Sequence, residues 1–87
     1  MPEDCLKSLT TSLMDGNPKD VVKYALESVE QYGVEKTLAS MYEGMDEVGR
    51  LFESGEYFIP QVLYSANNMK CGINAIKPYF KAAASFN

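Results

Sequence analysis

Two long segments of the chain carry apolar residues at the same alternating steps of four and three positions. In the first segment the stripe is Val34, Leu38, Met41, Met45, Val48 and Phe52, and in the second it is Val62, Ala66, Met69, Ile73, Ile76 and Phe80. Because such steps return to one face of an α-helix, each segment predicts an amphipathic helix. Two stripes of equal period suit two long helices that pack nearly antiparallel at a shallow angle.

Glycines and prolines mark where the helices begin and end. Gly16, Asn17 and Pro18 separate a first helix from a second, with Asn17 as the expected N-cap and Pro18 as the first helical residue. Gly33 ends the second helix and Gly55 the third. The expected helices therefore cover roughly residues 3–15, 18–31 and 35–54, and a fourth begins at Pro60.

The two shorter helices also carry apolar faces. Leu6, Leu9 and Leu13 lie on one face of the first helix, and the face of the second helix is formed by Val22, Ala25, Leu26 and Val29. No segment shows the strict alternation of a strand. The sequence therefore predicts an all-α fold, an antiparallel four-helix bundle.

Three residues interrupt the long helices. Gly44 and Gly49 lie inside the third helix, where each glycine costs about 1 kcal/mol relative to alanine. Such glycines indicate either a close approach of two helices or a place where a ligand or another domain comes near, and both readings stay open. Pro78 is expected to kink or end the fourth helix near Ile76 or Lys77.

Length and composition limit the function classes. The chain has 87 residues, enough for one domain, and 46% apolar residues, which is typical of a globular protein. No apolar run approaches the roughly 20 residues of a membrane span, and no signal-peptide core is present, so a cytoplasmic location without membrane contact is predicted. Twelve acidic and eight scattered basic residues argue against a nucleic-acid partner.

The chain contains no histidine. This excludes Ser-His and Cys-His nucleophile pairs, as well as the Glu-x-x-His sites of di-iron bundles. Cys5 and Cys71 lie far apart without ligand spacing and are expected to be free thiols. The carboxylates at Glu43, Asp46 and Glu47 fall mostly off the apolar stripe, which favours a solvated face. No catalytic residue and no metal ligand is therefore predicted.

The turn between the third and fourth helices is unusually apolar, because Phe52, Tyr57, Phe58 and Ile59 surround Gly55 and precede Pro60. One interpretation is a hydrophobic staple that closes the end of the bundle. The other is an exposed apolar patch that binds a partner or ligand. The residues alone leave the two interpretations equally supported.

A longer pattern surrounds this turn. Residues 44–80 contain Gly-Met-x-x-Val-Gly-x-x-Phe-x-x-Gly-x-x-Phe-Ile-Pro, followed by Met69 in the last helix and Pro78 near its end. This pattern resembles the helical cap domain of cobalamin-dependent methyltransferase proteins, including cobalamin-dependent methionine synthase and the small corrinoid proteins of methanol and methylamine methyltransferases. The match covers about 40% of the chain closely, and the first two helices only in size and pattern.

The resemblance implies a cap that lies over the upper face of a corrin ring and shields the cobalt-bound methyl group. By position, Phe52 and Ile59 press on that face with Val62 alongside, while Tyr57 and Phe58 close the bundle end. The cofactor-binding set expected from the resemblance is completed by Met45, Val48 and Gly49.

The chain departs from the family in one respect. The family places the lower cobalt ligand on a histidine of a Rossmann-like domain that follows the cap, whereas this chain has no histidine. We therefore expect residues 1–81 to form the cap, and residues 82–87 to begin a linker to that domain in a longer protein. Such a cap is not an enzyme by itself, and its expected partners are the Rossmann-like domain and methyltransferases.

Two alternatives remain beside the cap of a methyl carrier. A cobalamin-responsive regulator uses a similar helical cap, but such regulators place Trp and Glu-His on the cap, and this chain has neither Trp nor His. A plain protein-interaction bundle would use the apolar turn to bind another protein.

Overall fold

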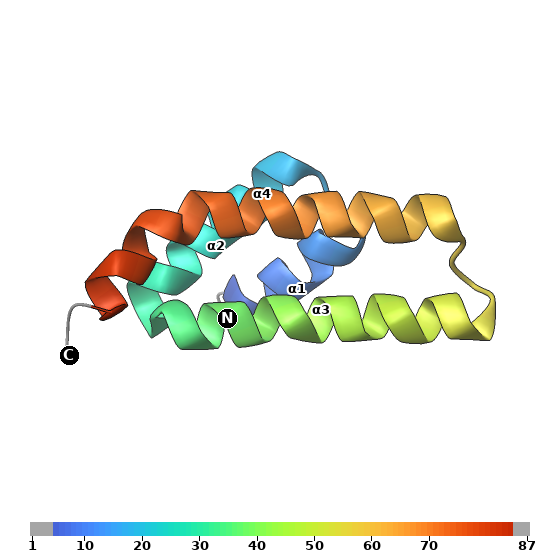
Figure 1. Cartoon of the computed structure of the whole chain (residues 1–87), viewed down its shortest axis with the longest axis horizontal. Coiled ribbons are helices and arrows are strands. Elements are labelled where there is room, and N and C mark those ends of the chain that lie inside the picture. Colours follow the sequence, from blue (N-terminus) through green and yellow to red (C-terminus); the bar gives the residue numbers. More distant parts are fainter. Residues whose placement is uncertain (1–4, 85–87) are drawn as a thin grey trace.

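Four α-helices form the described part of the chain, residues 5–84, with side chains described up to residue 80, in the computed structural model (Figure 1). In chain order they are α1 (Cys5–Asp15), α2 (Pro18–Tyr32), α3 (Val34–Ser54) and α4 (Ile59–Ala84). The two long helices α3 and α4 run antiparallel at the front of Figure 1, and α1 and α2 lie behind them. No strand occurs between residues 5 and 84, so the all-α four-helix bundle is confirmed.

The helix ends follow the local sequence. The Asn17 side chain accepts a hydrogen bond from the backbone N–H of Asp20 at 2.9 Å, which caps α2 as expected. Gly33 and Gly55 adopt positive φ angles of 94° and 89°, a region that glycine enters without steric cost. At the start of α4, the Gln61 side chain accepts from the backbone N–H of Phe58 at 2.8 Å. The expected first helix began at residue 3, which lies outside the described residues.

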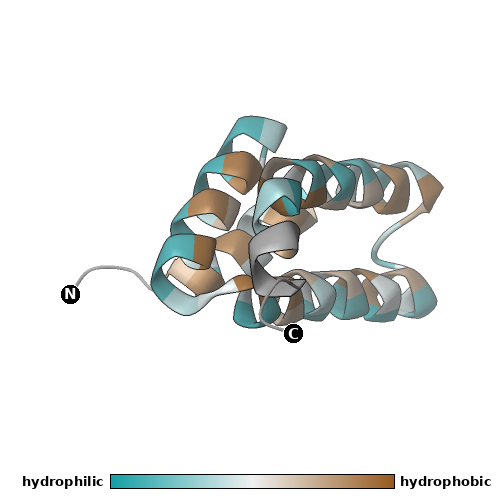
Figure 2. Ribbon diagram, turned by 60° about the vertical axis from the view of Figure 1, so that its left-hand side comes forward, coloured by the Kyte–Doolittle hydropathy of each residue, from teal (hydrophilic) through white to brown (hydrophobic). Residues whose placement is uncertain are grey.

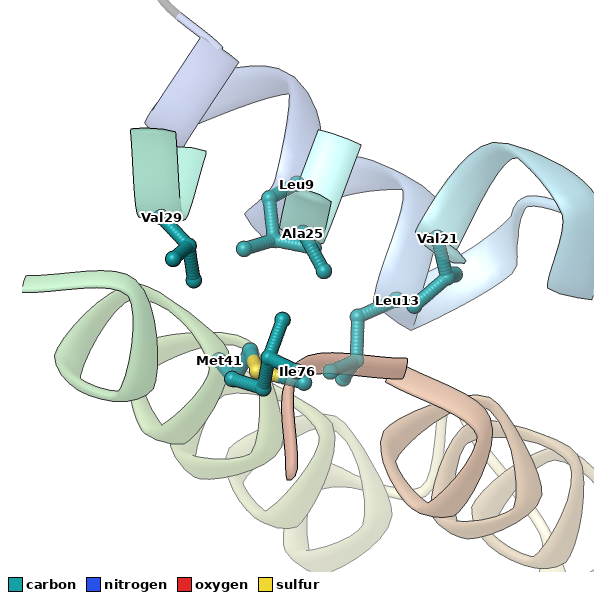
Figure 3. Packing of buried hydrophobic residues seen from close by; sticks show 7 residues of the cluster. All are labelled: Leu9, Leu13, Val21, Ala25, Val29, Met41 and Ile76. Carbon is teal, nitrogen blue, oxygen red and sulfur yellow. The ribbon is translucent and has the colours of Figure 1, made fainter. Parts of the chain in front are cut away.

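The core lies where all four helices meet. Figure 3 shows its central cluster, to which every helix contributes: Leu9, Leu13, Val21, Ala25, Val29, Met41 and Ile76. Two details differ from the expected stripes. In α2 the fully buried valine is Val21, and Val22 is only half-buried. In α4 Ala66 is exposed although it belongs to the apolar stripe.

Pro78 does not end α4. The helix continues through Pro78 to Ala84, and its last turns tilt away from the line of the preceding ones in Figure 1. A proline removes one backbone hydrogen bond, here the one to the carbonyl group of Asn74. Because Asn74 and Pro78 are both exposed, water can satisfy that carbonyl group and the helix can continue. The expected linker began at residue 82, but α4 extends to Ala84, and residues 85–87 lie outside the described residues.

The two glycines inside α3 have opposite surroundings. A Cβ atom added at Gly44 would lie 3.2 Å from the Thr10 carbonyl oxygen and 3.2 Å from the Leu13 side chain, so α1 and α3 approach closely there. A Cβ atom added at Gly49 would meet nothing within 4 Å. Close helix packing therefore accounts for Gly44 and leaves Gly49 without a packing reason.

Candidate functional site: the free end of the α3–α4 hairpin

The helices of the bundle differ in length, and this difference exposes one end of the hairpin formed by α3 and α4. Helices α1 and α2 have 11 and 15 residues, whereas α3 and α4 have 21 and 26. At 1.5 Å per residue, α1 is about 16 Å long and α4 about 39 Å. In both Figure 1 and Figure 2 the connection between α3 and α4 projects beyond the other two helices.

Hydrogen bonds fix the level at which α1 ends against α4. The Ser65 hydroxyl group donates to the Met14 carbonyl oxygen at 2.8 Å. The Asn68 side-chain amide donates to the carbonyl oxygens of Leu13 at 3.2 Å and Gly16 at 2.9 Å. Both side chains are fully buried. The last carbonyl groups of α1 are thus satisfied by side chains of α4, and the first turn of α4 lies beyond the end of α1.

Large apolar side chains gather on this uncovered part. Among the described residues, eight large hydrophobic side chains are exposed, and five of them fall between residues 52 and 64: Phe52, Phe58, Ile59, Leu63 and Tyr64. We call these five residues the exposed hairpin end. In Figure 2 brown segments reach the projecting tip of α4. Such a concentration on a small domain is typical of a surface that another molecule covers.

The exposed residues continue the apolar stripes of the core. Along α3, Met41 and Val48 are buried and Met45 is half-buried, whereas Phe52, the last residue of the stripe, is 44% exposed. Along α4, Ile76 is buried and Val62 is half-buried, whereas Ile59, one turn before Val62, is 56% exposed. The stripes that specify the bundle therefore extend past the two helices that cover them.

The residues expected to bind the cofactor occupy different depths. Phe52, Ile59 and Gly49 are exposed, and Val62 and Met45 are half-buried. Val48 is 1% exposed and belongs to the core, which leaves it no free surface. The helical spacing of Met45, Gly49 and Phe52, at i, i+4 and i+7, puts these three on one face of α3.

The expected lock at the bundle end is only partly present. Tyr57 is half-buried and lies beside Met14 and Tyr64, whereas Phe58 is 65% exposed. The expectation that Phe58 closes the bundle is wrong. The chain reverses at Gly55 beyond the ends of α1 and α2, so neither of these helices packs on Phe58 (Figure 1). Sequence reasoning also missed Leu63 and Tyr64. The i, i+4 spacing of Ile59 and Leu63 at the start of α4 was an available signal.

The charged groups near the hairpin end are three glutamates and one arginine, and all but the half-buried Glu47 are exposed. Arg50 forms an ion pair with Glu47 one turn earlier in α3, and this hydrogen-bonded partner raises the pKa of the Arg50 guanidinium. No charged residue occurs from residue 57 to residue 69. Within the described range no cluster of side chains could hold a metal ion. None of the helices between residues 5 and 84 is long and apolar enough to cross a bilayer.

Fold and site together define a small helical bundle with large apolar side chains exposed at one end. The family profile described as "B12 binding domain" matches residues 5–77. The chain therefore belongs to the B12 binding domain family, and the resemblance to the helical cap of corrinoid proteins is confirmed.

Several curated relatives come from species of Methanosarcina. The chain is 34% identical over 80 residues to dimethylamine corrinoid protein 2 of Methanosarcina acetivorans, covering 86% of this chain and 35% of the relative. It is 32% identical over 88 residues to dimethylamine corrinoid protein 2 of Methanosarcina mazei, covering 95% and 39%. Against trimethylamine corrinoid protein 1 of Methanosarcina mazei the identity is 54% over 35 residues, covering 40% and 16%.

The chain spans between a third and two fifths of the length of the two dimethylamine corrinoid proteins. No solved structure gives a significant match.

Proposed function

We propose that this bundle is the cap of a corrinoid methyl-carrier protein and that Phe52, Ile59 and Val62 at its exposed hairpin end cover the upper face of methylcobalamin. The observation that carries the proposal is the exposure of Phe52 and Ile59 at the point where the apolar stripes of α3 and α4 outrun α1 and α2. The relatives are named dimethylamine and trimethylamine corrinoid proteins, and these names support the same class of cofactor.

The residues present fit one face of a corrin ring. That face is broad and mostly apolar, and the stretch from residue 57 to residue 69 offers apolar side chains without a charged group. Gly49 adds a place where a ring can approach the α3 backbone, because no side chain of the bundle fills the space beside it. Val48 is buried and takes no part in the proposed surface.

A cap of this kind acts by excluding solvent from the cofactor that it covers. Bound cobalamin would supply the methyl–cobalt chemistry, and the apolar side chains of this chain would keep water and oxidants from that centre. The chain contains no histidine, so the proposed lower cobalt ligand belongs to a Rossmann-like domain of the same protein. A methyltransferase partner then requires the cap to move aside, as lids do in other enzymes. The bundle itself would not be catalytic.

Titration with methylcobalamin tests the proposal directly. In ¹H–¹³C spectra of the chain, we expect shifts of the Phe52 ring and of the Ile59 and Val62 methyl groups, with weak affinity because most cofactor contacts lie in the other domain. Phe52→Ala should weaken the response several-fold. Tyr42→Ala is the matched control, since Tyr42 is an exposed aromatic residue on the same helix, about 15 Å further from the tip.

A protection assay adds a second readout. In a protein that joins the cap to its corrinoid-binding domain, Phe52→Ala should speed the photolysis of bound methylcobalamin, whereas Tyr42→Ala should leave it unchanged. Unaltered photolysis together with unaltered cobalamin affinity in Phe52→Ala would contradict the covering role. Cobalamin that shifts no signal at Phe52 or Ile59, even in the joined protein, would favour a plain protein-interaction bundle.

A further inference from the structure

A second surface feature lies where the end of α1 meets the start of α4. It is a groove of about 310 Å³ lined by Met14, Asp15, Tyr57, Pro60, Gln61 and Tyr64. Its lining differs from the face proposed to cover cobalamin, because Tyr64 follows Val62 by two residues and so points about 200° away around α4. The groove is therefore a candidate for a different occupant.

The groove carries negative charge that nothing in the described structure neutralises. Asp15 is the last residue of α1, and the last turn of that helix holds no basic residue. The C-terminal end of a helix is itself partly negative, so the carboxylate adds to an existing negative potential. Among residues 5–80, no Lys or Arg forms an ion pair with Asp15. None of the six lining residues is basic.

The other lining groups are those that receive the stem and head of a cationic side chain. Two of the lining residues, Tyr57 and Tyr64, are aromatic, and aromatic rings attract cations. Met14 and Pro60 offer apolar surface along which the methylene stem of a long side chain can lie. The Gln61 side-chain oxygen already accepts from the Phe58 backbone N–H at 2.8 Å, and Asp15 is the one carboxylate among the six lining residues, so it is the acceptor best suited to a charged head group.

We propose that this groove accepts an arginine side chain presented by a partner protein. The planar guanidinium of arginine stacks on aromatic rings and pairs with carboxylates. It therefore suits a groove with two tyrosines and one aspartate better than the compact ammonium group of lysine does. The groove is open and shallow, so a single side chain gains little alone. Phe58, which adjoins the lining residues in sequence and is 65% exposed, offers the additional apolar contact that a protein surface can use.

Capped peptides provide the test. The probe is Ac-Leu-Arg-Leu-NH₂, and its control is the citrulline peptide Ac-Leu-Cit-Leu-NH₂, which has nearly the same shape without the charge. We expect the arginine peptide to shift the Met14 methyl signal and the ring signals of Tyr57 and Tyr64 saturably. Its affinity should exceed that of the citrulline peptide at least fivefold at low salt, and the difference should shrink as salt is raised.

Two matched variants locate the charge effect. Asp15→Asn should abolish the difference between the two peptides. Glu30→Gln makes the same change in charge at an exposed site of α2 outside the groove, and it should keep the difference. Asp15→Asn should also leave the cobalamin-induced shifts at Phe52 intact, so this result stands apart from the cap proposal.

Three outcomes would overturn the inference. Equal binding of the arginine and citrulline peptides would show that the positive charge of arginine does not contribute to binding. Unchanged selectivity in Asp15→Asn would place the contact elsewhere. Free methylguanidinium that reproduces the full shifts at the same concentration would indicate a site for small cations rather than for a protein.

Discussion

The base of the bundle and the exposed hairpin end are built from the same apolar stripes but meet different surroundings. At the base, α1 and α2 lie against the stripes, and Leu13, Met41 and Ile76 are fully buried. At the hairpin end, Phe52 and Ile59 continue those stripes with 44% and 56% of their surface exposed. The period of a stripe thus specifies which face of a helix is apolar, whereas the lengths of the neighbouring helices decide whether that face is covered within the chain.

The largest expected effect on stability appears when the same substitution, leucine to alanine, is made in each of the two regions. Leu13 is fully buried in the core cluster, and Leu13→Ala should lower the free energy of unfolding by about 3–5 kcal/mol through lost burial and the cavity left behind. Leu63 is 63% exposed at the hairpin end, and Leu63→Ala should change it by no more than about 0.5 kcal/mol. Urea unfolding followed by circular dichroism measures both values.

One result would contradict the expected difference between the two leucine variants. If Leu63→Ala cost as much as Leu13→Ala, the hairpin end would be covered in the isolated chain, either by a second copy or by a repositioned segment. Repeating the unfolding at several protein concentrations separates these cases, because only self-association makes the cost depend on concentration.

A smaller effect is expected at the boundary between the two regions. Asn68 is fully buried and donates to the carbonyl oxygens of Leu13 and Gly16. Asn68→Ala leaves these groups unsatisfied and should lower the free energy of unfolding by about 1–3 kcal/mol. Asn67→Ala, at the exposed neighbouring position, should cost less than about 0.5 kcal/mol.

Asn68→Ala should also loosen the end of α1 against α4. Hydrogen exchange of the last amides of α1 should then rise more than that of the first turns of α2. A uniform rise throughout the bundle would contradict a local clamp and indicate global destabilisation alone.

The helices and their ends could be predicted from the sequence because the signals are local. The stripe periods and the residues Asn17, Gly33 and Gly55 act within one or two turns, and the observed bounds agree with them. Gly44 was predicted as one of two possibilities, and the close approach of α1 decides between them. Exposure of Phe52 and Ile59 followed from the family resemblance, while the residues alone left it open.

The missed features depend on contacts between distant segments. Asn68 and Ser65 appear as ordinary polar residues in the sequence, and only the position of the α1 end makes them a clamp. Phe58 was assigned to the bundle end because a staple needs only local spacing, but no other helix extends far enough to pack on it. Pro78 was expected to kink or end α4; the helix does not end there, and its last turns tilt away from the preceding ones (Figure 1).

The smallest expected effects separate packing from function at two glycines of α3. At Gly44 a Cβ atom would press on the Thr10 carbonyl oxygen at 3.2 Å, and this crowding should outweigh the gain in helix propensity. Gly44→Ala should therefore destabilise the bundle by about 1 kcal/mol. At Gly49 nothing lies within 4 Å, so Gly49→Ala should stabilise the bundle by about 0.5–1 kcal/mol. Thermal or urea unfolding gives the sign of each change.

Gly49 is the more informative of the two glycines, because its helix-propensity cost brings no packing benefit within the bundle. If a corrin ring approaches the α3 backbone at this point, Gly49→Ala should weaken the methylcobalamin-induced shifts at Phe52 while it raises the stability of the chain. Opposite signs for stability and binding cannot arise from damage to the fold. If Gly49→Ala stabilised the chain and left the cobalamin-induced shifts unchanged, Gly49 would not belong to the contact surface. That surface would then consist of Phe52 and Ile59.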